Sequence, residues 1–155
     1  MGRVTDNGLE RLRDFASEAS LQAPDVSGWS IGMHVHHCAL GMIGMCNAVL
    51  ESSPPVPKSR FSALRTLVLA TGRIPRGRGK APEMALPNPD LEPSELNALL
   101  DQSKVLIGRV AEANRDQWWE HFIFGSLNRD QTLRFIGIHN GHHLRIMTDI
   151  RAAAG

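Results

Sequence analysis

An uncharged, mostly apolar stretch of 21 residues, from Ser30 to Leu50, most limits the folds open to this chain. Such a stretch is long enough to cross a lipid bilayer as a helix. It also contains three histidines, three glycines, a serine and an asparagine, which a membrane-spanning helix would have to bury. We therefore expect no membrane span. A helix without a polar face is instead covered on most sides by other parts of its own domain.

Helical periodicity continues in three other segments, so we expect four long helices. Each segment carries apolar residues three and four positions apart, the spacing that places side chains on one face of a helix. Start signals support two of them. Pro93 lies in the first turn of one, and Asn128 and Gln131 are spaced almost as in a capping box at the start of another. The expected helices span about residues 5–20, 30–51, 92–113 and 128–152.

A long connection rich in proline, glycine and arginine separates the second and third expected helices, over residues 53–93. Within it, the apolar spacing from Phe61 to Thr71 predicts a short helix, whereas residues 72–89 are expected to be irregular. Irregular segments of this length are often binding loops. No alternation of strands and helices suggests a parallel sheet. We predict one all-α domain over residues 1–155, a four-helix bundle with a long crossover connection between helices 2 and 3.

Two cysteines, Cys38 and Cys46, both lie in the second expected helix. Helical geometry separates them by roughly 12 Å along the axis, which is too far for a disulfide. We expect both to pack in the core as free thiols, and free thiols suit a reducing compartment. The N-terminal residues lack the apolar core of a secretory signal. The expected location is therefore the cytoplasm.

Basic residues are concentrated in the long connection. Residues 53–82 contain seven lysines and arginines and no acidic residue, whereas the remainder contains ten basic and sixteen acidic residues. Such a segment can attract an anionic ligand, and its second half would lie where a lid reaches the end of the bundle. A solvated loop is the simpler interpretation. Nucleic-acid binding is not expected, because the charges are not interleaved with aromatic residues. The residues of the possible lid are Arg73, Arg76, Arg78 and Lys80.

Six of the seven histidines fall in two clusters, one in the second expected helix and one in the last. In the last helix, His139 and His143 are four residues apart, as two ligands on one helix face must be. They also continue the inward series that contains Ile136 and Ile146. Imidazoles inside a core are costly unless their nitrogens are used. We predict that this pair binds a metal ion; hydrogen-bonded core histidines are the alternative.

The remaining histidines are harder to assign. His142 falls to one side of the inward face, so we expect it beside the site or exposed. The second helix must supply a third ligand, but spacing alone does not separate His34, His36 and His37, because this helix is apolar on all sides. No catalytic residue is evident. The weak candidate for an acid or base is His121, for which a structural role at the start of the last helix is the alternative.

Two features resemble the DinB-like (YfiT-like) family of metal-binding bundles. His37 follows Trp29-Ser30 at eight residues from the tryptophan, as at the opening of the second helix in that family. His139-x-x-x-His143 matches the second family signature, near the end of the last helix. The resemblance implies a four-helix bundle in which His37, His139 and His143 hold one divalent metal ion, nickel or zinc.

A third feature is similar to an uncharacterised branch of the same superfamily. That branch carries a His-Pro-x-Phe-Gly-x-Leu-Ser stretch just before the last helix. Here the corresponding run extends from His121 to Asn128, with Phe122 in place of the proline and Asn128 in place of the serine. The His-x-x-Phe-Gly part of the pattern is retained.

Three imidazoles leave open positions on a divalent ion, which is typical of catalytic rather than structural metal sites. The charge of the ion lowers the pKa of a bound water or thiol. Relatives in the family include thiol-dependent transferases and metal-dependent hydrolases. We therefore expect a metal-dependent hydrolase or thiol-dependent transferase that acts on a small molecule, either anionic or a low-molecular-weight thiol. The alternative is a non-catalytic metal- or ligand-binding protein of stress response or secondary metabolism. Family habit suggests a homodimer.

Overall fold

The computed structural model describes residues 2–58, 62–77 and 81–155, and it is mostly helical. Short turns and one long connection join its elements. The five α-helices of the described residues are α1 (Gly2–Ala16), α2 (Ile31–Glu51), α3 (Ala63–Thr71), α4 (Pro93–Glu112) and α5 (Arg129–Ala154). A short 3-10 helix, η1 (Glu83–Ala85), precedes α4, and two strands, β1 (Trp118–His121) and β2 (Gly125–Asn128), precede α5.

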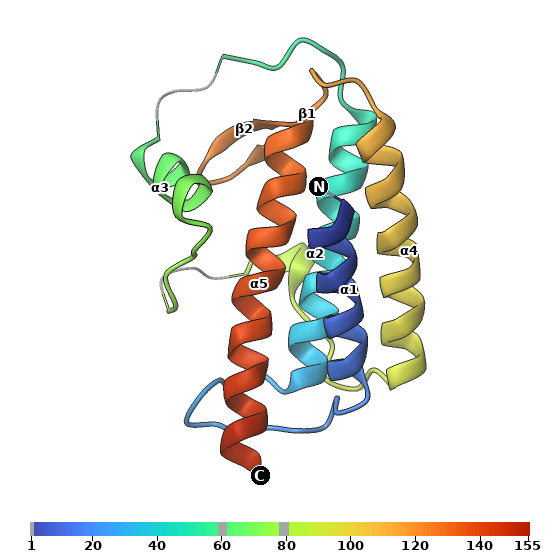
Figure 1. Cartoon of the computed structure of the whole chain (residues 1–155), viewed down its shortest axis with the longest axis vertical. Helices are drawn as coiled ribbons and strands as arrows, with labels where there is room; N and C mark the ends of the chain where they lie inside the picture. Colours follow the sequence, from blue (N-terminus) through green and yellow to red (C-terminus); the bar gives the residue numbers. More distant parts are fainter. Residues whose placement is uncertain (1, 59–61, 78–80) are drawn as a thin grey trace.

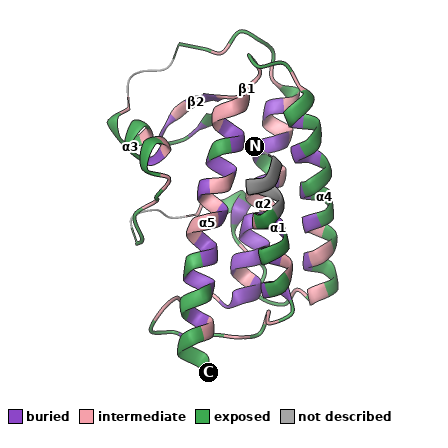
Figure 2. Cartoon of the chain, in the orientation of Figure 1, coloured by how far each residue is buried: buried purple, intermediate pink, exposed green. Residues whose placement is uncertain are grey.

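The helices α1, α2, α4 and α5 lie side by side, and each contacts the other three (Figure 1). Their inward faces carry the buried residues, and their outward faces are exposed (Figure 2). Val35 and Met42 of α2, Leu100 of α4 and Ile136 of α5 are completely buried in this core. Among the described residues, no helix is both long and apolar enough to cross a membrane.

Capping interactions fix the starts of the helices that carry the histidine clusters. The Ser30 hydroxyl accepts the Met33 N–H at 3.2 Å, as expected for the N-cap of α2. At α5, Asn128 accepts the Gln131 N–H, and the Gln131 side chain accepts the Asn128 N–H. This complete capping box confirms the predicted start of the last helix. The first helix, predicted over about residues 5–20, instead spans Gly2–Ala16.

The hairpin of β1 and β2 is the part of the fold that the sequence analysis did not predict. The strands are antiparallel, with Trp118 opposite Asn128 and His121 opposite Gly125. The hairpin contacts both α2 and α5, and Figure 1 shows it at the end of the bundle where α5 begins. Arg65 of α3 donates hydrogen bonds to the carbonyls of Phe124 and Ser126. The short helix of the long connection is therefore fastened to the hairpin.

The connection between α2 and α4 returns to the bundle before α4 begins. Ser62 caps the start of α3. Gly72 caps its end, with a φ of 65° in the left-handed region that glycine favours. α3 contacts α5, whereas η1 contacts α2. The connection thus passes first along one helix of the core and then along another. Its last part, around η1, comes to lie against the histidines of α2.

Candidate metal centre

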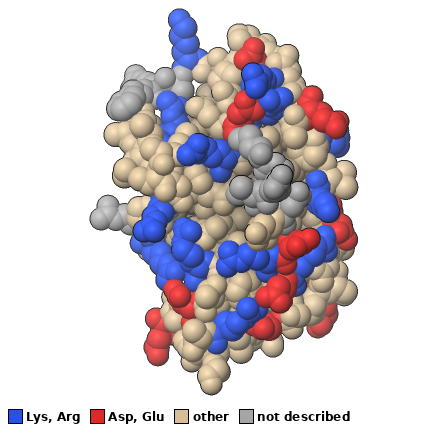
Figure 3. Space-filling model, in the orientation of Figure 1, with Lys and Arg blue, Asp and Glu red and all other residues tan. Residues whose placement is uncertain are grey.

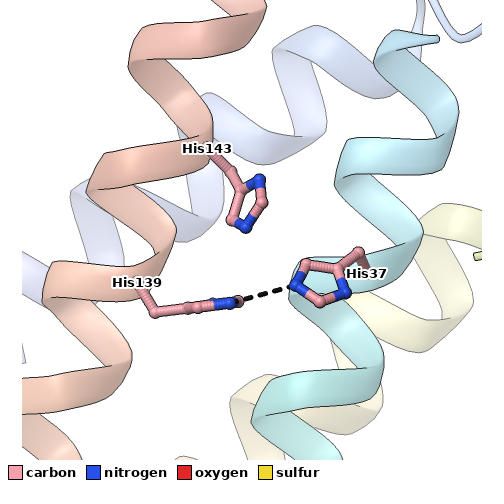
Figure 4. A group of neighbouring side chains, drawn as sticks. All are labelled: His37, His139 and His143. Atoms are coloured by element: carbon pink, nitrogen blue, oxygen red, sulfur yellow. Dashed lines mark hydrogen bonds between the residues drawn. The ribbon is translucent and has the colours of Figure 1, made fainter. Parts of the chain in front are cut away.

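Three histidines from two helices converge in the interior of the bundle. His37 comes from α2, and His139 and His143 come from successive turns of α5. One nitrogen of each ring lies within 4.8 Å of the corresponding nitrogens of the other two. The nearest pair is Nε2 of His37 and Nε2 of His139, 3.1 Å apart. Figure 4 shows the three rings directing nitrogens toward the space between them.

All three imidazoles are electrically neutral at pH 7. Burial, together with the nearby His37, lowers the pKa of His139 to about 3. Burial likewise holds the pKa of His37 below its usual value and that of His143 far below it. A neutral ring is the form of histidine that binds metal ions, because protonation would remove the donor lone pair.

The backbone carbonyl of Ala85 determines which nitrogen of His37 carries hydrogen. Nδ1 of His37 lies 2.7 Å from this oxygen. A carbonyl oxygen only accepts, so Nδ1 must donate, and in a neutral ring Nε2 then keeps its lone pair. That lone pair faces the other two histidines. Such a hydrogen bond to the nitrogen away from the metal is the usual support of a metal-binding histidine.

The other two histidines differ in their support. Nδ1 of His143 lies 2.9 Å from Nδ1 of His34, so Nε2 is the nitrogen that remains for the centre of the group. Nδ1 of His139 is buried and has no hydrogen-bond partner among the described residues. It faces α2 at Gly41, where a β-carbon would stand 3.9 Å away. Nε2 of His139, which lies 3.1 Å from Nε2 of His37, is the nitrogen that a ligand at the centre would contact.

These residues fit a divalent metal ion. The three neutral imidazoles each bring one nitrogen to the same point, and no described carboxylate belongs to the group. Three histidines leave at least one position of a four-coordinate ion open. The Trp29 ring forms a wall beside the group, with its centroid 5.1 Å from that of His37 and 6.4 Å from that of His143. The arrangement can therefore hold an ion and leave room for water or a substrate next to an aromatic surface.

The comparison with protein families agrees with this geometry. The model of the DinB superfamily matches residues 2–147, nearly the whole chain. The chain belongs to the DinB superfamily. The match includes Trp29-Ser30 and all three histidines of the group, so it covers the features that suggested the family. Searches of the curated proteins and of the solved structures found no match.

Two further histidines of this DinB-superfamily protein lie near the group but outside it. His142 is half-buried, and its ring centroid lies 5.0 Å from that of His143. His36 is buried, and its Nδ1 accepts the Asn88 N–H at 2.9 Å. The neighbouring His37 donates to Ala85. Two consecutive histidines of α2 therefore hold the same part of the connection. Spacing along the sequence did not reveal this division of roles.

His121, the weak catalytic candidate, lies in the hairpin. Its Nδ1 accepts the backbone N–H groups of Ile123 and Phe124, at 3.0 and 3.2 Å. The ring stacks on Phe124 and meets Phe135 edge to face. These contacts use His121 to close the turn between β1 and β2. In the neutral ring, only Nε2–H remains for any other contact.

The cysteines belong to the core. Cys38 and Cys46 are buried and form no disulfide. Burial raises the pKa of Cys46 to about 12 and that of Cys38 well above its usual value. Both are therefore thiols rather than thiolates at neutral pH, and a thiol is a poor nucleophile and a poor metal ligand.

Positive charge gathers near the outer side of the histidine cluster. Figure 3 shows lysine and arginine side chains grouped over α5 and the connection beside it. The pKa of His142 is lowered by burial and then by the positive charges of Arg145 and Arg76. Arg76 also pairs with Asp149 at 2.7 Å. Of the other residues of the possible lid, Arg73 is exposed, whereas Arg78 and Lys80 lie outside the described residues.

Proposed function

We propose that this member of the DinB superfamily binds one nickel or zinc ion through His37, His139 and His143 and uses it in catalysis on a small molecule. The observation that carries the proposal is the convergence of three neutral imidazoles, two buried and one half-buried, on one point. The hydrogen bond from His37 to Ala85 strengthens it, because it turns the Nε2 lone pair toward that point. The reaction is that of a metal-dependent hydrolase or a thiol-dependent transferase.

The chain provides the setting for either reaction. A bound divalent ion would lower the pKa of a water or thiol and so supply a nucleophile at neutral pH. Three uncharged ligands leave the full charge of the ion in place. Trp29 offers an apolar surface beside the group, and the buried faces of α2 and α5 exclude bulk water from its other sides.

The charges around the centre favour an anionic substrate or an anionic low-molecular-weight thiol. The charges of Arg76 and Arg145 act on His142, and the ring of His142 lies beside that of His143. The negative partner of Arg76, Asp149, is half-exposed and can be displaced by a carboxylate of a ligand at modest cost, because exposed ion pairs contribute little.

A non-catalytic metal- or ligand-binding protein, of stress response or secondary metabolism, is the second candidate. This candidate differs from an enzyme in whether the bound ion keeps an exchangeable water. Water relaxation measured with a paramagnetic ion, such as Co²⁺, distinguishes an open ion from a fully coordinated one.

The first test is the metal content of the purified protein and its histidine variants, measured by mass spectrometry after loading with nickel or zinc. We expect about one ion per chain in the wild type and none in His37→Ala, His139→Ala or His143→Ala. His142→Ala is the matched control, because His142 lies on the same helix outside the group, and it should retain the ion. A wild type without metal, or full metal content in any of the three variants, would contradict the proposed ligand set.

A further inference from the structure

A further buried histidine, His34, is linked to the metal centre through one of the proposed ligands. Nδ1 of His34 lies 2.9 Å from Nδ1 of His143, and the two rings are buried. On its other side, Nε2 of His34 lies 3.0 Å from the hydroxyl oxygen of Ser27. His143, His34 and Ser27 thus form one chain of hydrogen bonds. It leads from the interior to a partly exposed residue before α2.

Only two arrangements of hydrogen satisfy this chain when both rings are neutral, because each ring then carries one N–H. In the first, Ser27 donates to His34, and Nδ1 of His34 donates to His143. The hydrogen of His143 must then sit on Nε2, which blocks that nitrogen for a metal ion. In the second, Nδ1 of His143 donates to His34, and Nε2 of His34 donates to Ser27. Nε2 of His143 then keeps its lone pair.

We propose that His34 is a positioning residue that accepts the Nδ1–H of His143 and thereby turns the Nε2 lone pair of His143 toward the metal centre. The inference rests on the proposed function, because it concerns how a metal-binding site is prepared. His34 would do for His143 what the Ala85 carbonyl does for His37. The hydrogen-bond acceptor in this arrangement is unusual, because it is a second imidazole rather than a carboxylate or carbonyl.

Ser27 can satisfy the second arrangement, which binding of a metal ion by Nε2 of His143 would select. Its hydroxyl oxygen already accepts the Trp29 N–H at 3.1 Å, and an oxygen with two lone pairs can accept a second hydrogen from Nε2 of His34. The hydroxyl hydrogen of Ser27 is then free to point to solvent. The same residue that holds the backbone at Trp29 therefore completes the support of His143.

His34 does not itself belong to the proposed ligand set. The nitrogens that lie within 4.8 Å of one another come from His37, His139 and His143. Nδ1 of His34 is directed at Nδ1 of His143, the side of that ring away from the other two ligands. Both nitrogens of His34 have hydrogen-bond partners already.

Zinc affinity, measured by competition with a chelating indicator, tests this role with two matched variants. His34→Asn retains an oxygen close to the place of Nδ1 and can still accept from His143. His34→Leu has a similar volume and cannot accept. Loss of a supporting hydrogen bond costs roughly 10–100-fold in metal affinity. We expect that loss in His34→Leu, and an affinity within a few-fold of the wild type in His34→Asn.

Nitrogen-15 NMR of the histidine rings provides a readout on the unaltered protein. Zinc-loaded wild type should show His143 with hydrogen on Nδ1 and His34 with hydrogen on Nε2. Hydrogen on Nε2 of His143 would overturn the proposal, and so would equal loss of affinity in the Asn and Leu variants. If the wild type binds zinc and the His34→Leu variant binds it with the same affinity, this inference alone is overturned. Wild type that binds no zinc overturns the proposed function as well.

Discussion

His121 shows how a single buried imidazole can be required in its neutral form for a purely structural reason. Its Nδ1 lone pair receives two backbone N–H groups, and aromatic rings surround it. Burial lowers its pKa from 6.5 to about 4. A proton on Nδ1 would remove the acceptor for both N–H groups at once. The hairpin therefore depends on this one ring remaining neutral.

The pH dependence of stability should report this ring. Below pH 6.5 the unfolded chain protonates His121 while the folded chain does so only near pH 4, so stability falls as the pH falls through this window. His121→Asn keeps an oxygen acceptor and does not titrate. Urea unfolding at pH 7 and pH 5 should show a larger loss of unfolding free energy in the wild type than in this variant.

The other histidines titrate in both proteins, so they cancel in the comparison. Parallel losses of stability would show that the His121 lone pair is not needed for the hairpin. His121→Ala is the complementary control at pH 7. It leaves two N–H groups without their acceptor and should lower the unfolding free energy by about 1–3 kcal/mol.

At the same scale, the sequence located the two histidines of α5 but did not choose among those of α2. The spacing of His139 and His143 follows a helical face, and a face is a local property of the chain. His34, His36 and His37 lie on a helix that is apolar on all sides, so the sequence does not show which of its faces points inward. Their roles depend on Ala85, Asn88 and His143, which are distant in sequence. Only the family resemblance pointed to His37.

Among the elements, α2 contains glycines that serve different purposes. A β-carbon on Gly32 would lie 2.9 Å from the β-carbon of Ala19 and 3.0 Å from its carbonyl oxygen. That carbonyl accepts the Gly32 N–H at 2.9 Å. The end of the turn after α1 thus lies directly on the first turn of α2. At Gly44, by contrast, no described atom outside the helix's own backbone lies within 4 Å of the β-carbon position.

Opposite effects on stability are therefore expected from the same substitution at two places in one helix. Gly44→Ala should raise the free energy of unfolding by about 0.5–1 kcal/mol, because alanine restricts the unfolded chain without a clash. Gly32→Ala should lower the free energy of unfolding, since backbone atoms of Ala19 must move. Urea unfolding of both variants measures the difference, and a stabilised Gly32→Ala protein would contradict the close approach.

The elements themselves were predicted unevenly, for a physical reason. Long helices repeat their apolar spacing over many turns, and caps such as Ser30 and Asn128 mark their starts, so their ranges were nearly right. The hairpin has two strands of four residues. It is held by a side-chain acceptor in its turn and by Arg65 of α3, rather than by an alternating pattern. Contacts of that kind leave no periodic signal in the sequence.

For the molecule as a whole, an ion held by both α2 and α5 links two of the four packed helices. Such an ion binds the folded chain and not the unfolded one, so it should stabilise the fold. At a free zinc concentration roughly 100-fold above the dissociation constant, the gain is about 2.7 kcal/mol. For a chain of this size, each kcal/mol raises the melting temperature by roughly 2–4 °C.

Thermal unfolding with and without zinc measures this effect, with an expected rise in the melting temperature of roughly 5–10 °C. A chelator should reverse the rise. The His139→Ala protein should show no response, while the His142→Ala protein should respond as the wild type does. A rise of equal size in the His139→Ala protein would mean that the stabilising ion binds elsewhere.

The attachment of the long connection to α2 has a consequence for how the centre can respond to its surroundings. Ala85 and Asn88 are held by consecutive histidines, and one of these bonds sets the orientation of the His37 lone pair. Anything that draws this segment away from α2 therefore weakens the hold on an ion. By reciprocity, a bound ion tightens the segment. If the centre holds an ion, the connection is thermodynamically coupled to it, and a ligand that binds the connection at the surface changes the affinity of the interior for that ion.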